Sequence, residues 1–186
     1  MADVTEPLQV LIERAKETGA SSVKMISTDN VFIEDYVRIK CQYGCRMYGI
    51  RLTCPPHTPT PEETRKWLRG YKYGLLMEFR NMKDEEDQRQ VHEKSLELER
   101  EAFFMGFYRA LLLVSGPCRY CNPCVAEKSE NRSLLSKADC LYPRKARPSM
   151  EAVGIDVYKT ARKAGFEINV IKDREPYKSF VLLLLE

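Results

Sequence analysis

The sequence has no long apolar run and no strong excess of charge of one sign. Its most apolar stretch, Phe180 to Leu185, is far too short to span a bilayer. The 30 Lys and Arg residues stand against 27 Asp and Glu residues, and the net charge of +3 is too small to indicate nucleic-acid binding. We therefore expect neither a membrane nor a nucleic acid among the partners of this protein.

The usual catalytic and targeting signatures are also missing. The chain contains no P-loop, no G-x-G-x-x-G, no G-x-S-x-G and no H-E-x-x-H, so nucleotide-binding, common hydrolase and zincin functions have no support. No complete arrangement of acid, base and nucleophile is visible, and the sequence leaves open whether the chain is an enzyme. The acidic, polar start lacks the basic region and apolar run of a signal peptide, which predicts a cytoplasmic protein.

Cysteine is the residue that the sequence has in excess. The seven cysteines are an odd number and fall into two groups, which does not fit a secreted disulfide framework. In a reducing compartment such clustering favours metal ligation. The seven divide naturally into a group of four and a group of three.

The denser group is the run Cys118-x-x-Cys121-x-x-Cys124. A tetrahedral zinc site usually takes one C-x-x-C pair and a distant second pair, whereas a cubane cluster suits three closely spaced thiolates, each on a different iron. The spacing therefore predicts a [4Fe–4S] cluster, with zinc as the alternative. Cys140 is the nearest candidate for the fourth ligand, and Cys54, which is followed by proline, is the other.

The second group has the spacing C-x3-C-x8-C and comprises Cys41, Cys45 and Cys54, followed by Pro55-Pro56-His57. It predicts a second metal site, and the alternative is three unrelated thiols beside a turn. If this site also holds a cubane, one iron lacks a cysteine, and His57, a small thiol, sulfide, water or a residue of a partner protein could bind there. His57 could equally be a solvent-facing loop residue, or it could complete a Cys3His zinc site.

Periodicity and end signals predict a mixed order of helices and strands. We expect an α/β or α+β fold, a single domain over residues 1–186 with about four or five core strands flanked by helices and two cysteine-rich metal loops. A buried strand leads directly into Cys118 and would hold that loop rigidly. The helices are expected at about 5–18, 58–67, 84–108 and 149–164, with part of 125–138, and the strands at 22–27, 31–38, 71–79, 109–115, 166–172 and 179–185.

Three further side-chain features complete these expectations. His92 lies among Glu, Gln and Lys and is assigned to a polar helix face without a role. The aromatic residues near the C-terminal end of the helix expected over 84–108 should widen its apolar surface. A short basic group near the triplet would stabilise a reduced cluster or simply be a solvated charge run. The aromatic residues are Phe103, Phe104 and Phe107, and the basic ones are Arg144, Lys145 and Arg147.

The two cysteine groups and the stretch after Cys140 resemble a known family. In these features the chain is similar to archaeal and bacterial proteins catalogued as predicted metal-binding proteins. They share a domain of unknown function that is common in anaerobes and methanogens. The resemblance implies metal binding, in the first place iron–sulfur, and supplies no activity. The matching features, between about residues 40 and 157, are Cys41 and Cys45 with Cys54-Pro-Pro, Gly-Pro-Cys118-x-x-Cys121-x-x-Cys124, and Cys140 leading to Arg147-Pro-Ser-Met-Glu-Ala-x-Gly-Ile-Asp156-Val.

Three functions compete on this basis. The leading hypothesis is an iron–sulfur protein of anaerobic redox or sulfur and metallocofactor metabolism, in which Cys118, Cys121, Cys124 and Cys140 hold an electron-transfer cluster. Its second, three-cysteine cluster would have an open iron, and a redox or metalloenzyme protein would be its partner. The alternatives are a structural zinc-binding interaction module and a subunit or maturation factor of a larger metalloenzyme.

Overall fold

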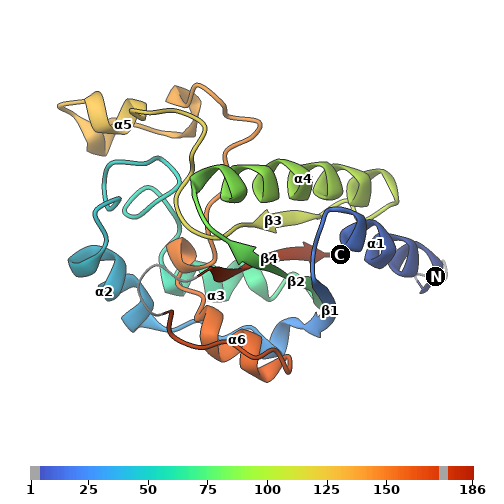
Figure 1. Cartoon of the computed structure of the whole chain (residues 1–186). Coiled ribbons are helices and arrows are strands. Elements are labelled where there is room, and N and C mark those ends of the chain that lie inside the picture. Colours follow the sequence, from blue (N-terminus) through green and yellow to red (C-terminus); the bar gives the residue numbers. More distant parts are fainter. Residues whose placement is uncertain (1–4, 172–175) are drawn as a thin grey trace.

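A computed structural model describes residues 5–171 and 176–186 of the chain. In this described part, four strands form one antiparallel sheet in the order β1-β2-β4-β3, and six α-helices accompany them (Figure 1). The fold is therefore a single α+β domain, as the sequence predicts. The strands are β1 (Ser22–Ser27), β2 (Tyr73–Met82), β3 (Leu111–Leu113) and β4 (Tyr177–Leu185).

The apolar run near the end of the sequence forms the central strand β4. Its residues from Ser179 to Leu185 are buried, because β2 and β3 pair on either side and helices cover the sheet. Leu183 lies opposite Leu75 of β2 and opposite Leu112 of β3. A strand buried on both faces needs apolar side chains at consecutive positions, which explains the continuous run.

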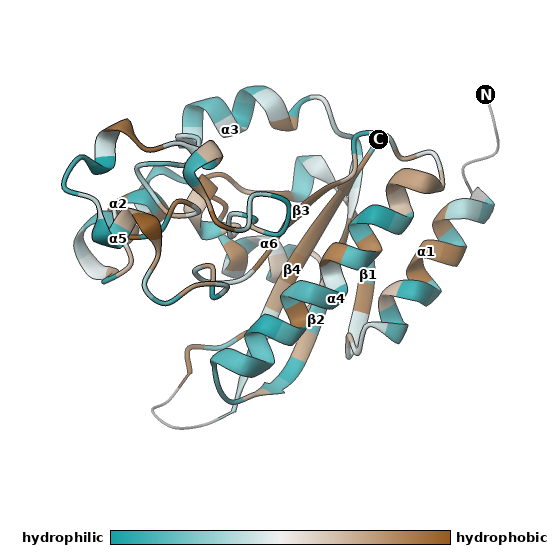
Figure 2. Cartoon of the chain, turned by 90° about the horizontal axis from the view of Figure 1, so that it is seen from above, coloured by the Kyte–Doolittle hydropathy of each residue, from teal (hydrophilic) through white to brown (hydrophobic). Residues whose placement is uncertain are grey.

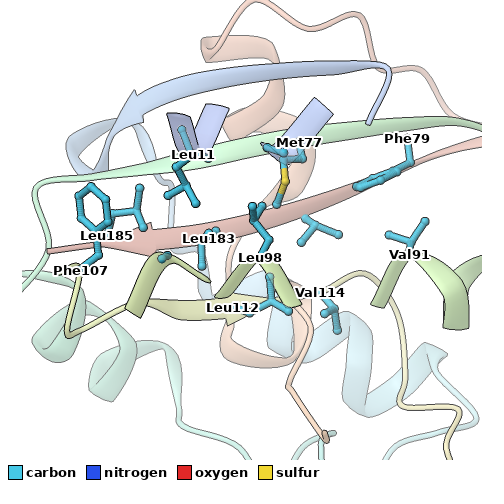
Figure 3. Close-up of a cluster of buried hydrophobic side chains, with 14 of the residues drawn as sticks. Leu11, Met77, Phe79, Val91, Leu98, Phe107, Leu112, Val114, Leu183 and Leu185 are labelled. Atoms are coloured by element: carbon cyan, nitrogen blue, oxygen red, sulfur yellow. The ribbon is translucent and has the colours of Figure 1, made fainter. Parts of the chain in front are cut away.

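One face of the sheet is covered by α1 (Thr5–Glu17) and α4 (Glu85–Phe104). Leu11 of α1 and Leu98 of α4 pack with Met77 of β2 in a shared core (Figure 3). Both helices carry apolar residues on the inner side and polar residues on the outer side, as their colouring in Figure 2 shows. Asp84 caps α4 by accepting hydrogen bonds from the backbone N–H groups of Glu86 and Asp87.

The other face is covered by α3 (Pro61–Leu68) and α6 (Val157–Lys163). Leu76 and Leu182 from the sheet pack there with Leu68 and with Ile155, which precedes α6. The start of α3 follows the sequence prediction, since Thr60 and Glu63 form a reciprocal capping box.

The extended segment predicted over residues 31–38 is wrong, because helix α2 (Asp35–Gly44) begins inside it. The backbone is extended at Val31 and Glu34, and the short bridge from Ile33 to Ile155 lies between them. Tertiary contacts decide where the helix begins. The backbone N–H of Phe32 donates to the Thr160 hydroxyl, and the N–H of Glu34 donates to the carbonyl of Gly154. The helix begins directly after these two bonds, at Asp35.

The helix predicted over residues 149–164 is interrupted. A 3-10 turn at Glu151–Val153 ends at Gly154, whose φ of +87° is a left-handed conformation that stops a helix, and α6 begins only after Asp156. The strand predicted over 166–172 is absent from residues 166–171, and Lys172 lies outside the described residues.

Side chains of α4 differ from the expectation in two ways. His92 is only 6% exposed, so it belongs to a buried face and not to a polar one. Phe103 and Phe104 are 54% and 72% exposed, and only Phe107 enters the core. The helix ends at Phe104, and Gly106, with φ of +100°, turns the chain back so that Phe107 alone points inward. Among the described helices, none is long and apolar enough to cross a membrane.

Candidate metal centre

The cysteine-bearing segments lie on one side of the molecule, where Figure 1 shows α2 and, separated from it by loop chain, α5 (Val125–Lys128). Cys41 lies in the last turn of α2, and Cys45 ends that helix with its N–H bonded to the carbonyl of Cys41 at 3.3 Å. Cys54 follows in an irregular loop and is buried, whereas Cys41 is half-buried and Cys45 is exposed. The first cysteines are thus placed by a helix, not by the loop that the sequence predicts.

Cys41 and Cys54 of this group have raised pKa values, and Cys45 is a neighbour of both. Burial raises the pKa of Cys54 to about 12, and the neighbouring charges of Cys45 and Cys41 act in the same direction. Burial also raises the pKa of Cys41, again with Cys45 as a contributing neighbour. The structure therefore brings Cys41, Cys45 and Cys54 together.

The triplet begins just beyond strand β3, as the sequence predicts. The chain passes Val114, which forms a bridge with Ser149, and then Gly116-Pro117 before it reaches the buried Cys118. Cys124 is also buried, and it stands immediately before the first residue of α5. A core strand and a short helix therefore hold the two ends of the triplet.

Cys140 lies near this triplet. Burial raises the pKa of Cys118, and the neighbouring charges of Cys140 and Cys124 raise it further against a hydrogen bond from the Tyr120 backbone. Burial raises the pKa of Cys121 to about 11, and the other three cysteines of the group act in the same direction.

The donor set fits a thiolate-bound metal group. All seven cysteines are free thiols, and thiolate is the soft ligand that iron–sulfur clusters and zinc prefer. Within residues 5–171 and 176–186, no three Cys, His, Asp or Glu side chains are placed as ligands of a single metal ion.

A cavity of about 720 Å³ adjoins the three-cysteine group. Cys41, Cys45 and Cys54 line it, and Gly116 and Pro117 reach it from the segment that leads into the triplet. Its walls are mostly tyrosine and aliphatic side chains, and its volume lies in the range of small-molecule sites. Other lining residues are Tyr36, Tyr43, Tyr48, Glu151, Asp156 and Tyr158.

Two hydrogen-bonded groups hold the cavity walls together. The Tyr36 hydroxyl donates to Asp156 Oδ2 at 2.5 Å, and this bond raises the pKa of Tyr36 to about 12. Because Asp156 also caps α6 through Lys159 N, the pair joins α2 to α6. Arg38 of α2 donates to the carbonyl of Ala152 at 2.7 Å, which anchors the helix that carries Cys41.

Arg51 is a charged residue that the sequence analysis missed. Its side chain is buried, and its Nη1 donates to Glu127 Oε2 of α5 at 2.7 Å. Nothing in the sequence distinguishes it from Arg46, five positions earlier, which is exposed. Only the packing of the two cysteine segments reveals it.

Two of the residues weighed in the sequence have different surroundings from those expected. His57 Nε2 is buried and has no hydrogen-bond partner among the described residues, so His57 is not simply a solvent-facing residue. In the basic group near the triplet, Arg147 forms an ion pair with Glu99 at 2.5 Å, and its charge is therefore largely compensated.

Comparison with known proteins bears on this site. A family described as "Predicted metal-binding protein (DUF2284)" has a sequence model that matches residues 24–185. The chain belongs to this family. The match includes both cysteine groups, and it confirms the resemblance seen in the sequence. No curated protein and no solved structure matches the chain. The DUF2284 description states metal binding without naming the metal.

Proposed function

We propose that this DUF2284 protein is an iron–sulfur protein with two thiolate centres of different kind. The observation that supports it most is the arrangement of the seven free thiols: Cys41, Cys45 and Cys54 line one cavity, and the other four belong to the segment from the buried Cys118 to Cys140. Cys118, Cys121, Cys124 and Cys140 would hold a [4Fe–4S] cluster. The ligand density of the triplet favours this cluster over zinc.

A fully ligated cluster supplies one-electron transfer when it is bound. The protein contributes burial and rigidity, since Cys118 and Cys124 are 8% and 5% exposed and are held by β3 and α5. Cys121 and Cys140 are half-buried and lie nearer the surface, where a redox or metalloenzyme partner would dock.

The three-cysteine centre would have a coordination position that no cysteine fills. Cys41, Cys45 and Cys54 all line the cavity, so a small molecule could reach such a position from it. A soft metal held by three thiolates favours a soft fourth ligand, which points to a small thiol or sulfide. Anaerobic redox chemistry or sulfur and metallocofactor metabolism is the function that this pair of centres serves best.

The first prediction assigns the fourth ligand of the triplet. Anaerobically purified protein is expected to contain about eight iron and eight sulfide per chain, which is two cubane clusters. Cys140→Ser should remove the triplet cluster and leave the other, and Cys54→Ser should do the reverse. Iron and sulfide analysis with electron paramagnetic resonance measures both. If Cys54→Ser abolishes the triplet signal and Cys140→Ser does not, our assignment of the two thiols is wrong.

A structural zinc protein is the second candidate, and one observation favours it. The buried, unpartnered Nε2 of His57 would complete a Cys3His set with Cys41, Cys45 and Cys54. The same metal analysis separates the candidates. A colourless protein with about two zinc ions per chain and no sulfide would replace the iron–sulfur proposal with this one.

A further inference from the structure

Arg51 is a buried cation at the junction of the two cysteine groups. The residue is 9% exposed, and a buried charge is costly unless it is paired. Its pairing is incomplete, because the N–H at Nε is buried and has no acceptor among the residues that the structure describes. Nη1 alone bonds the carboxylate of Glu127.

A continuous path of hydrogen bonds runs through this ion pair from one cysteine group to the other. The backbone N–H of Cys54 donates to the carbonyl of Arg51 at 3.0 Å. The guanidinium of Arg51 donates to Glu127 at 2.7 Å, and the N–H of Glu127 donates to the carbonyl of Cys124 at 3.0 Å. The ion pair between Arg51 and Glu127 therefore links the two cysteine segments.

The ion pair stands close in sequence to a cysteine of each group. Arg51 is three residues before Cys54, and Glu127 is three residues after Cys124. The buried guanidinium and its carboxylate partner therefore join the segment of one centre to the segment of the other. Arg46 and Arg144, which are exposed, do not share this position.

We propose that Arg51 is a positioning residue shared by the two metal centres: through its ion pair with Glu127 it joins the two cysteine segments, and it would raise the reduction potential of the group that each of them holds. This inference rests on the proposed function, since it requires two reducible centres. A cluster with thiolate ligands gains negative charge on reduction, and a buried cation stabilises that form more strongly than a hydrated cation would. The unpaired N–H at Nε of Arg51 would also be able to donate a hydrogen bond to a sulfur atom of a bound cluster.

The test compares charge removal on the two sides of the ion pair. Arg51→Gln should shift the midpoint potentials of both clusters to more negative values, and Arg51→Lys, which keeps the charge, should shift them less. Glu127→Gln should shift both in the opposite direction, because it leaves Arg51 less compensated. Arg69→Gln removes an exposed charge at the end of α3 and should leave both potentials unchanged. Anaerobic redox titration followed by electron paramagnetic resonance measures the potentials.

Opposite shifts for Arg51→Gln and Glu127→Gln are the result that a merely structural role would not produce. If both variants shift the potentials in the same direction, or if Arg51→Lys changes them as much as Arg51→Gln, the inference is overturned. A shift at one centre only also overturns the shared role. Wild-type protein without iron and sulfide would instead refute the proposed function, and this is measured before any variant is titrated.

Discussion

His92 shows how one buried side chain links stability to pH. Burial lowers the pKa of its imidazole to about 4, and the charges of Arg147 and Arg119 act in the same direction against the backbone of Lys145. Its ring packs edge-on against Tyr120, with 5.0 Å between centroids, so the folded protein holds the neutral form. The unfolded chain binds a proton near pH 6.5.

Folding stability should therefore fall as the pH drops from about 6.5 to about 4, because the unfolded state binds a proton that the folded state excludes. The contribution of His92 is fully present above pH 6.5, and its loss amounts to about 3 kcal/mol below pH 4. Urea unfolding at several pH values checks this. His92→Gln should flatten that part of the profile, and an unchanged slope in the variant would contradict the role given to this residue.

At the scale of elements, α3 is the clearest case of a helix that its own residues specify. Thr60 Oγ1 accepts from the N–H of Glu63 at 3.2 Å, and Glu63 accepts from the N–H of Thr60 at 2.7 Å. Pro61 fits the first helical position because its missing N–H would have no partner there. By contrast, α2 depends on distant partners such as Gly154 and Thr160 for its starting point.

Thr60→Ala should lower the free energy of unfolding by about 1 kcal/mol, because the cap loses its side-chain acceptor. Thr60→Ser keeps that acceptor and is the matched control, for which we expect a much smaller loss. Denaturant midpoints at constant slope measure the difference. Equal losses in the two variants would show that the hydroxyl is not what stabilises the start of α3.

For the whole molecule, β4 is the element on which both helical layers depend. Leu183 is fully buried and pairs with residues of β2 and β3. Leu183→Ala should cost about 2–5 kcal/mol, through lost apolar contact and a residual cavity. Leu134→Ala, at a position that is 80% exposed, should change stability by less than about 0.5 kcal/mol. Chemical unfolding of both variants in the same metal state tests this, and similar losses would contradict a core role for Leu183.

Elements whose stability is local or whose burial is complete could be predicted from the sequence. The run Phe180–Leu185, the capped start of α3 and the first helix, α1, could all be predicted, because hydrophobic periodicity and end signals reside in neighbouring residues. The cysteine spacing likewise indicated metal binding, which family membership supports.

Other features of the candidate site depend on the tertiary structure. The two cysteine groupings were already proposed from spacing, whereas the cavity beside Cys41, Cys45 and Cys54 and the burial of Arg51 appear only in the folded chain. These two could not be predicted from the sequence, because each depends on contacts between segments far apart in the chain. Local patterns specify a helix or a strand, whereas the surroundings of a charge or a thiol depend on what the rest of the fold packs against it.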